Sequence, residues 1–134
     1  MHPKVFVDSD VVISSLLSQK GAAASLINGT NLKRFISNKS EEEIERVALD
    51  LNIDKKEVQK VVDKRFSKVA LKDSLEEIKE KYSDYVKDPN DAHIVAGAHT
   101  SKAKFIISYN QKDFNPNKIK EDFILARFSS HYYK

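Results

Sequence analysis

The stretch "DPNDAHIVAGA", residues 88–98, places two aspartates at the start of what its composition predicts to be a buried helix. Asp88 and Pro89 suit the N-cap and the first helical position, because Asp accepts hydrogen bonds from free amides and proline has no amide to leave unpaired. Asp91 lies one turn further on, before small and apolar residues that favour close packing. Its carboxylate either offsets the helix dipole or points into a site whose other members lie elsewhere in the chain.

Strand patterns occur on both sides of this helix. Runs of apolar residues predict strands at 4–8 ("KVFVD"), 34–37 and 103–110, and "FILARF" (123–128) predicts an edge strand. Each of the first three is short enough to be a buried strand of a parallel sheet. The clearest are the first, which ends at an acid, and 103–110.

Helical patterns fill the intervals between these strands. Helices are predicted to begin at Asp10, Ser40 and Asp54, and two more are predicted over 22–27 and 74–86. The last of these runs into a short extended piece. The alternation of strands and helices favours an α/β fold with a mostly parallel sheet. No repeat, low-complexity tract or linker interrupts it, so we expect residues 1–134 to form a single domain.

The composition limits the class of protein. A chain of 134 residues with 40% hydrophobic content is large enough for one ordinary core. No run reaches the length of a membrane span, and the apolar start carries two acids, unlike a signal peptide. The lack of cysteine excludes disulfides, thiolate zinc sites and cysteine nucleophiles and favours a cytoplasmic location. A formal charge of +3 permits an anionic partner without requiring one.

Acidic residues follow the predicted strands at the edge where sites form in open parallel sheets. Asp8 ends the first strand, and Asn110 and Asp113 follow the strand that ends near Ser108. Glu43 and Asp91 fall in the first turns of helices that can start from the same edge. Four carboxylates there would raise one another's pKa unless a divalent cation neutralised them. Ligands that are all oxygen indicate magnesium or manganese rather than zinc or copper.

Each acid also has a purely structural explanation. Asp8 can be a turn residue after a strand, and Asp113 an ordinary loop acid. Glu43 stands three positions after Ser40, the spacing of a capping box, and three neighbouring glutamates are alternative ligands: Glu41, Glu42 and Glu45. Only the joint placement of the four acids favours a site over these local explanations.

Four motifs in this order resemble those of PIN-domain ribonucleases, including toxins of VapC type. They are "VFVDSDVVISSLL", "ISNKSEEEIERVA", "DPNDAHIVAGA" and "FIISYNQKDF", and they span nearly the whole chain, with 54–82 carrying the least. The resemblance implies a three-layer α/β/α fold and metal-dependent hydrolysis of phosphodiester bonds in single-stranded RNA. It matches Asp8 to the family's first metal-binding aspartate, Glu43 to its glutamate and Asp91 to its third acid.

The fourth site position departs from the commonest family pattern. Many PIN domains have an aspartate where this chain has Asn110, two residues after a small hydroxyl residue, here Ser108. Asp113 then supplies the fourth carboxylate, or the site has three acids and an amide. Asp10, at a position that is often Asn in the family, either caps the helix or adds a fifth acid. We expect Mg²⁺ or Mn²⁺ to be held by the four catalytic acids, Asp8, Glu43, Asp91 and Asp113.

Neutral and basic residues near these acids are candidates for substrate binding. Ser108 and Asn110 can hydrogen-bond a water or a phosphate oxygen, and Lys39, Lys112 and Lys104 can hold the RNA backbone, although ordinary solvated lysines would look the same. No RNA-recognition motif with stacking aromatics is present, so no sequence preference is predicted. The resemblance further implies two protein partners, a cognate antitoxin covering the acidic pocket and a second copy of the chain.

Two other functions fit parts of the sequence. The DxD in "FVDSDVV" also begins haloacid-dehalogenase-type phosphatases, but no glycine follows it and the chain is short for that fold. A PIN-like module with a weakened metal site could instead bind RNA or protein without catalysis. Asn110, an amide where a carboxylate is common, keeps this second alternative open.

Overall fold

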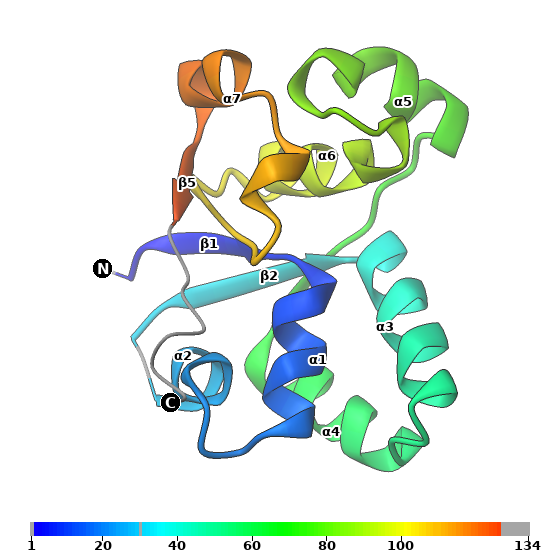
Figure 1. The fold of residues 1–134 in the computed structure, drawn as a ribbon, viewed down its shortest axis with the longest axis vertical. Coiled ribbons are helices and arrows are strands. Elements are labelled where there is room, and N and C mark those ends of the chain that lie inside the picture. The colour runs from blue at the N-terminus through cyan, green and yellow to red at the C-terminus, as the bar shows by residue number, and fades with distance from the viewer. Residues whose placement is uncertain (1, 30, 127–134) are drawn as a thin grey trace.

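A parallel sheet runs through the part of the chain that the structure describes. The structure is a computed structural model that describes residues 2–29 and 31–126. Within these ranges five strands pair in the order β3-β2-β1-β4-β5, every neighbouring pair being parallel (Figure 1). The strands are β1 (Lys4–Val7), β2 (Lys33–Ser37), β3 (Ser67–Val69), β4 (Phe105–Ile107) and β5 (Ile124–Ala126). The expected α/β fold with a parallel sheet is confirmed.

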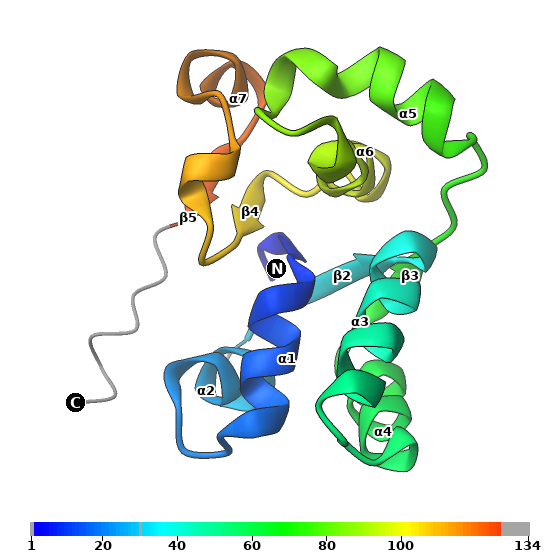
Figure 2. The same cartoon turned by 45° about the vertical axis from the view of Figure 1, so that its right-hand side comes forward.

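Helices cover both faces of this sheet and complete three layers. One group comprises α1 (Ser9–Leu17), α2 (Ala22–Gly29), α3 (Asn38–Asp50) and α4 (Lys55–Arg65). The other comprises α5 (Leu75–Tyr82), α6 (Ala92–Ser101) and α7 (Pro116–Asp122). Figure 2 shows the two groups on opposite sides of the strands. None of the helices in the described ranges is long and apolar enough to cross a bilayer.

Alternation along β1 divides the core into two clusters. Val5 and Val7 point into the cluster formed with α1 to α4, whereas Phe6 points into the cluster formed with α5 to α7. All three side chains are buried. A strand buried on both faces must be apolar throughout, which explains the uninterrupted run before Asp8.

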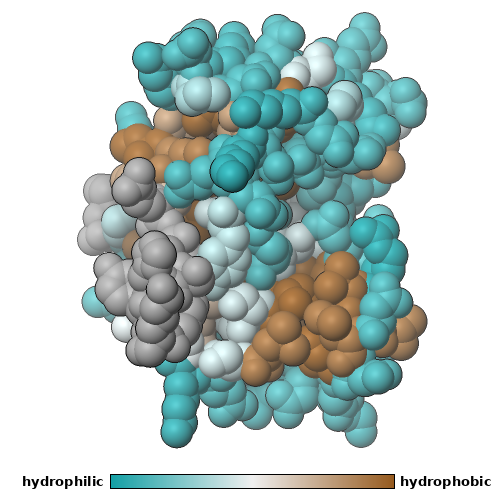
Figure 3. All heavy atoms as spheres, viewed as in Figure 1, coloured by the Kyte–Doolittle hydropathy of each residue, from teal (hydrophilic) through white to brown (hydrophobic). Residues whose placement is uncertain are grey.

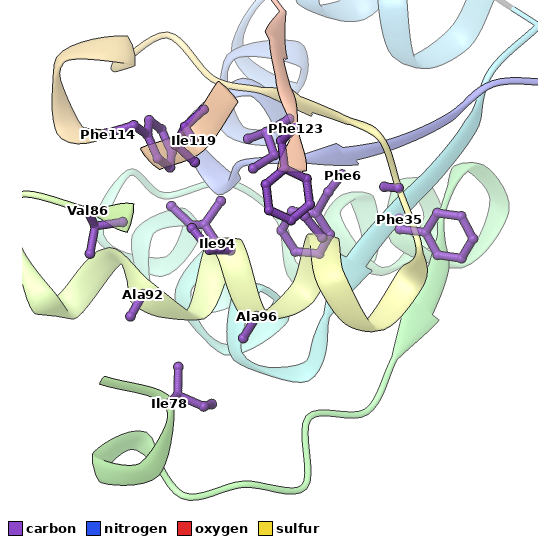
Figure 4. Packing of buried hydrophobic residues seen from close by; sticks show 14 of the residues in the cluster. Phe6, Phe35, Ile78, Val86, Ala92, Ile94, Ala96, Phe114, Ile119 and Phe123 are labelled. Atoms are coloured by element: carbon purple, nitrogen blue, oxygen red, sulfur yellow. The ribbon is translucent and has the colours of Figure 1, made fainter. Parts of the chain in front are cut away.

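Helix α6 is buried between the sheet and α5, as its composition predicts. All residues from 92 to 98 are buried. Figure 4 shows Ile78 of α5 on one side of α6 and Phe6 on the other. Gly97 lies against the Phe6 ring, and a Cβ added at Gly97 would lie 2.3 Å from two ring atoms. The small residues of "AHIVAGA" therefore let the helix approach the sheet closely.

The starts of two helices differ from the prediction. Asp8, not Asp10, is the N-cap of α1, and its Oδ1 accepts from the Ser9 amide at 2.8 Å. Ser37, not Ser40, is the N-cap of α3, and its Oγ accepts from the Ser40 amide at 3.1 Å. Both helices begin directly at the ends of strands, so the last extended residue becomes the cap. The capping box predicted for Ser40 and Glu43 is therefore wrong.

Helix α5 and the turns beside it follow the prediction in part. Ser74 and Glu77 form a capping box at the start of α5, and a short 3-10 turn, η1 (Ser83–Tyr85), follows the helix. Val86, the last residue of 74–86, belongs to the short extended piece that was expected there, and it makes an isolated antiparallel bridge with Phe114. Two further 3-10 turns are η2 (Pro89–Asp91), which leads into α6, and η3 (Gln111–Asp113).

The remaining strands and helices test the other expectations. The strand expected at 103–110 is shorter, as β4, and β5 confirms an edge strand within "FILARF". Positions 127 and 128 of that motif lie outside the described residues. Asp88 caps η2 as expected, its Oδ1 accepting from the Asn90 amide at 3.0 Å. Strand β3 and helix α7 were not predicted.

Candidate active site

Asp8 occupies the centre of the carboxyl edge of the sheet. It follows β1, is 7% exposed, and its Oδ2 accepts a 2.8 Å hydrogen bond from Ser108 Oγ at the end of β4. Burial and the charges of Asp10 and Glu43 raise its pKa to about 7, although hydrogen bonds from Ser108 and Ser9 partly oppose this. Asp8 is therefore an acid whose charge the folded protein does not fully compensate.

Asp10 and Glu43 approach Asp8 from two different helices. Asp10 lies in the first turn of α1, and burial together with the charges of Asp113 and Glu43 raises its pKa to about 6. Glu43 lies on α3, and its Oε1 accepts a hydrogen bond from Ser9 Oγ. Ser9 thus connects the start of α1 to α3 across the site.

The three glutamates next to Glu43 in the sequence, Glu41, Glu42 and Glu45, make different contacts from Glu43. Glu41 forms an ion pair with Lys68 at 3.0 Å, and Glu42 and Glu45 are exposed. Among these four glutamates, only Glu43 both bonds Ser9 and raises the pKa of Asp8. The structure therefore favours Glu43 over its neighbours as the glutamate that joins Asp8 and Asp10.

Asp91 faces this cluster from the junction of η2 and α6. It makes no side-chain capping hydrogen bond to α6. Burial raises its pKa to about 6, and the charges of Asp113, Asp88, Glu43 and Asp10 act in the same direction. The carboxylate is therefore surrounded by other acids rather than engaged at the helix end.

Turn η3 brings Asp113 back towards the cluster. The Asp113 amide donates to the Asn110 carbonyl at 3.0 Å, and the Asp113 carbonyl accepts from the Lys87 amide at 2.8 Å, close to η2. The charge of Asp113 raises the pKa of both Asp10 and Asp91. Asn110 instead donates from its side-chain Nδ2 to Asp10 Oδ2 at 3.0 Å, and its backbone N–H donates to Ser108 Oγ at 3.0 Å. We call Asp8, Asp10, Glu43, Asp91 and Asp113 the acidic cluster.

The three candidate lysines lie in different places. Lys39 is half-buried near the start of α3 and lowers the pKa of His93, so it lies close to the cluster. Lys112 is exposed on η3, between Asn110 and Asp113. Lys104 precedes β4 and therefore lies at the opposite edge of the sheet, because parallel strands all end at the same edge. The expectation that Lys104 serves this site is wrong.

Two polar residues of the site were missed by sequence reasoning. Ser9 stands between two acids in "DSD", and its contact with Glu43 spans 34 positions that no local pattern connects. His93 is 8% exposed and interrupts an otherwise apolar run, which is the one signal that could have identified it. Burial and nearby Lys39 lower its pKa against the influence of Glu43, so the ring is neutral at pH 7. His93 Nε2 lies 4.0 Å from Glu43 Oε2.

The acidic cluster has the chemistry of a site for a hard divalent cation. Its charged donors are all carboxylate oxygens, and mutual repulsion and burial raise the pKa of three of them, a cost that a bound cation would relieve. Within residues 2–29 and 31–126, no three His, Cys, Asp or Glu side chains already lie close enough to hold a metal ion. The residues fit Mg²⁺ or Mn²⁺ in kind, and binding would require the carboxylates to close around the ion.

Comparison with known proteins identifies the family. A family model described as PIN domain matches residues 4–112, which is most of the chain. The chain therefore belongs to the PIN domain family, and this assignment replaces the phosphatase alternative. The match includes Asn110, where the chain departs from the commonest pattern, and ends one residue before Asp113. By sequence, no curated protein matches the chain.

Solved structures show the same fold. VapC20 of Mycobacterium tuberculosis, described as a sarcin-ricin loop cleaving toxin, is similar with a TM-score of 0.60 and 13% identity, over 92% of this chain and 98% of that chain. VapBC2 of Rickettsia felis, bound to a DNA fragment from its promoter, gives a TM-score of 0.58 and 13% identity. The match covers 89% of this chain and 92% of that chain. At this identity the likeness concerns the fold.

Proposed function

We propose that this PIN domain is a metal-dependent endoribonuclease that hydrolyses phosphodiester bonds in single-stranded RNA in the cytoplasm. The observation that carries the proposal is the acidic cluster, whose members come from the start of α1, from α3, from η2 and from η3, and in which burial and neighbouring charges raise the pKa of Asp8, Asp10 and Asp91. Ionisable groups perturbed in this way gather at functional sites more often than elsewhere. Family membership and the fold shared with a toxin that cleaves RNA support the same reaction.

In this proposal Asp8, Glu43, Asp91 and Asp113 hold Mg²⁺ or Mn²⁺. When bound, the cation lowers the pKa of a water molecule and stabilises the charge that grows on the phosphate. Ser108 holds Asp8 in place, and Ser9 does the same for Glu43. Five of the chain's 20 acidic residues gather here, so the rest of the molecule is more basic than the formal charge of +3 suggests.

Substrate binding in this proposal involves four residues around the cluster. Asn110 is exposed beyond the end of β4, where a phosphate oxygen can approach its side-chain amide, and Ser108, which is fully buried, supports it by accepting a hydrogen bond from its backbone amide. Lys39 lies on α3 and Lys112 on η3, and both can contact the RNA backbone. Backbone contacts of this kind carry no sequence information, which agrees with the absence of a predicted sequence preference.

We further propose a protein partner, a cognate antitoxin, that binds along α1 and α3. VapBC2, with the same fold, supports a toxin–antitoxin assignment. Leu17 at the end of α1 and Leu49 and Leu51 at the end of α3 are exposed. Figure 3 shows an apolar area in the region of α1 and α3, which favours a protein partner over open solvent. A homodimer would use such a surface as well, and light scattering of the purified chain distinguishes the two partners.

The test is cleavage of a labelled single-stranded RNA by the purified protein. We expect activity with Mg²⁺ or Mn²⁺, none in EDTA, and none in Asp8→Ala or Asp91→Ala. Both variants should keep the far-UV circular dichroism of the wild type, because removing one of several repelling charges does not destabilise a metal-free site. Cleavage that persists unchanged in both variants would come from a contaminant or another site.

One observation favours a second function, RNA or protein binding without catalysis. Asn110 stands at the end of β4 and donates to Asp10, so it reduces the repulsion at the place where many PIN domains carry an additional acid. Titration with manganese distinguishes the two functions. Binding in the millimolar range or tighter that Asp8→Asn abolishes supports the enzyme, whereas RNA binding without metal binding supports the module.

A further inference from the structure

We propose that a cavity beside the acidic cluster, between α3 and α5, binds the nucleotide adjacent to the scissile phosphate of the RNA. This inference rests on the proposed ribonuclease function and extends it to the path of the substrate. The cavity measures about 360 Å³. Its lining comes from α3, α5, η2 and α6, and comprises Lys39, Glu42, Glu43, Arg46, Leu75, Lys79, Asn90 and His93.

The position of the cavity connects it to the site. Glu43 belongs both to the acidic cluster and to the cavity wall, and His93, 4.0 Å from Glu43, lies in the same wall. A strand whose scissile phosphate lies over the acidic cluster therefore reaches the cavity with its next nucleotide. The cluster itself repels phosphate, so neighbouring contacts must supply the attraction that holds the substrate.

Positive charge converges on the cavity from two helices. Lys39 and Arg46 come from α3 and Lys79 from α5, against Glu42 and the Glu43 that the cation would engage. Arg46 lies 4.0 Å from Glu43 with its side chain 71% exposed, so this contact is weak and the guanidinium can reach an incoming phosphate. Lys79 has no ion pair among the described residues. A weakly paired arginine and a lysine without an ion pair among the described residues can therefore bind an anion.

The other lining groups suit the rest of a nucleotide. His93 lines the cavity, and its ring is not held through Nδ1, which is buried and has no hydrogen-bond partner within the described part of the chain. Asn90 adds an amide that can donate or accept. Leu75 is 48% exposed and offers an apolar surface to a ribose or a base. Cations, polar groups and an apolar surface together match a phosphate with its nucleoside.

The experiment measures binding of a fluorescein-labelled hexauridylate RNA by anisotropy, with Ca²⁺ in place of Mg²⁺, over a range of KCl concentrations. The variants are Lys79→Ala and the double variant Arg46→Ala/Lys79→Ala. The control is Lys60→Ala, which removes the same charge from an exposed position on α4. Each lost phosphate contact should reduce the slope of log K against log salt by about 0.7, which corresponds to about fivefold weaker binding at 0.1 M salt.

We expect one lost contact for Lys79→Ala, two for the double variant and none for Lys60→Ala. Slopes and affinities of both cavity variants equal to the wild type would overturn the proposal. An equal effect of Lys60→Ala would also overturn it, because binding would then follow the total charge of the protein. A lower melting temperature of Lys79→Ala with an unchanged slope would overturn it as well. If the cavity variants behave as expected but the wild type does not cleave RNA, the ribonuclease function fails and the cavity remains a nucleotide site.

Cleavage kinetics give a second, independent readout when the wild type is active. With the hexauridylate as substrate, Lys79→Ala should raise KM more than it lowers kcat, because the contact is made away from the reacting phosphate. A loss in kcat alone would place Lys79 at the reacting centre and contradict a site for the neighbouring nucleotide. Equal KM values for Lys79→Ala and the wild type would contradict it too.

Discussion

Ser108 Oγ donates a 2.8 Å hydrogen bond to Asp8 Oδ2 and so joins the ends of two neighbouring strands, β4 and β1. This bond lowers the pKa of Asp8, whereas burial and nearby acids raise it to about 7. We predict that Ser108→Ala raises this pKa further and weakens manganese binding, because protons then compete better for the carboxylate. The deficit should be several-fold at pH 6.5 and smaller at pH 8.5, measured by manganese titration.

The matched control for this variant is Ser101→Ala. Ser101 is buried as well, but its hydroxyl donates to the Ala98 carbonyl within α6, at 3.1 Å. Its removal should leave manganese affinity unchanged at both pH values. A deficit of equal size at pH 6.5 and pH 8.5 in Ser108→Ala would show that the hydroxyl contacts the metal shell directly and does not act through the protonation of Asp8.

The acidic cluster should make the metal-free protein less stable at pH 8 than at pH 6. The pKa of Asp8 is raised from 3.8 to about 7, and those of Asp10 and Asp91 to about 6. Because the folded state then binds protons more tightly than the unfolded state, the stability these groups contribute is full below pH 3.8 and is lost as the pH rises through 6 to 7. We expect the melting temperature in EDTA to fall by several degrees between pH 6 and pH 8.

Manganese and one substitution provide the checks on this pH dependence. Added Mn²⁺ should restore the melting temperature at pH 8, since it binds the folded state. Asp8→Asn should flatten the dependence. His93 acts in the opposite direction, because its lowered pKa stabilises the protein above 6.5, but it is one group against three carboxylates. A melting temperature that rises from pH 6 to pH 8 in EDTA would contradict the raised pKa values.

Most of the fold could be predicted because its central strands have strong apolar patterns in the sequence. The elements that could not be predicted have weak patterns. Strand β3 has three residues, the first two exposed, so no apolar run indicates it. Its position at the sheet edge explains this, since an edge strand buries less. Helix α7 has seven residues and buries Ile119 alone, so its helical period cannot be recognised from the sequence.

The candidate site could be predicted only where topology alone places a residue. Asp8 ends a strand, and any residue there lies at the carboxyl edge of a parallel sheet. Glu43 fits a capping box by local spacing, and only the tertiary contact with Ser9 shows that its carboxylate turns towards the acidic cluster. Ser37 could not be chosen over Ser40 as the cap without knowing that β2 continues directly into α3.

Gly97→Ala should destabilise the protein although alanine favours helices. The new methyl group would lie 2.3 Å from atoms of the Phe6 ring, which is fully buried and cannot move aside freely. We expect a loss of about 1–3 kcal/mol in the free energy of unfolding, as for other overpacked cores. Urea denaturation measures it. Gly29→Ala is the control, because nothing lies within 4 Å of a Cβ there, and it should be close to neutral.

A second substitution identifies the Phe6 ring as the cause. Phe6→Leu should lower stability by itself through the cavity that it leaves. Combined with Gly97→Ala, the loss should be smaller than the sum of the two single losses, because the space vacated by the ring accommodates the methyl group. Additive losses would mean that Gly97→Ala acts elsewhere in α6.

The last prediction concerns which residue occupies the fourth position of the acidic cluster. Asp113→Asn should weaken manganese binding and RNA cleavage sharply, and Asn110→Ala should cost less, because a carboxylate neutralises a divalent cation and an amide does not. Turn η3 supports this order, since the charge of Asp113 already raises the pKa of Asp10 and Asp91, whereas Asn110 donates to Asp10. Asp113→Asn should therefore also lower the pKa of Asp91, which carboxyl NMR titration of the metal-free protein measures.

Manganese dissociation constants of Asp113→Asn and Asn110→Ala, measured at one pH, decide between the two residues. If Asn110→Ala costs more, the amide belongs to the metal shell, and Asn110→Asp should then raise metal affinity by adding charge. If Asp113→Asn lowers the melting temperature and leaves metal affinity unchanged, the Asp113 carboxylate only braces turn η3. Weaker manganese binding supports Asp113 as the fourth ligand, because a residue that only braces the turn would leave metal affinity unchanged. The lower Asp91 pKa shows in either case that the neighbouring charge has been removed.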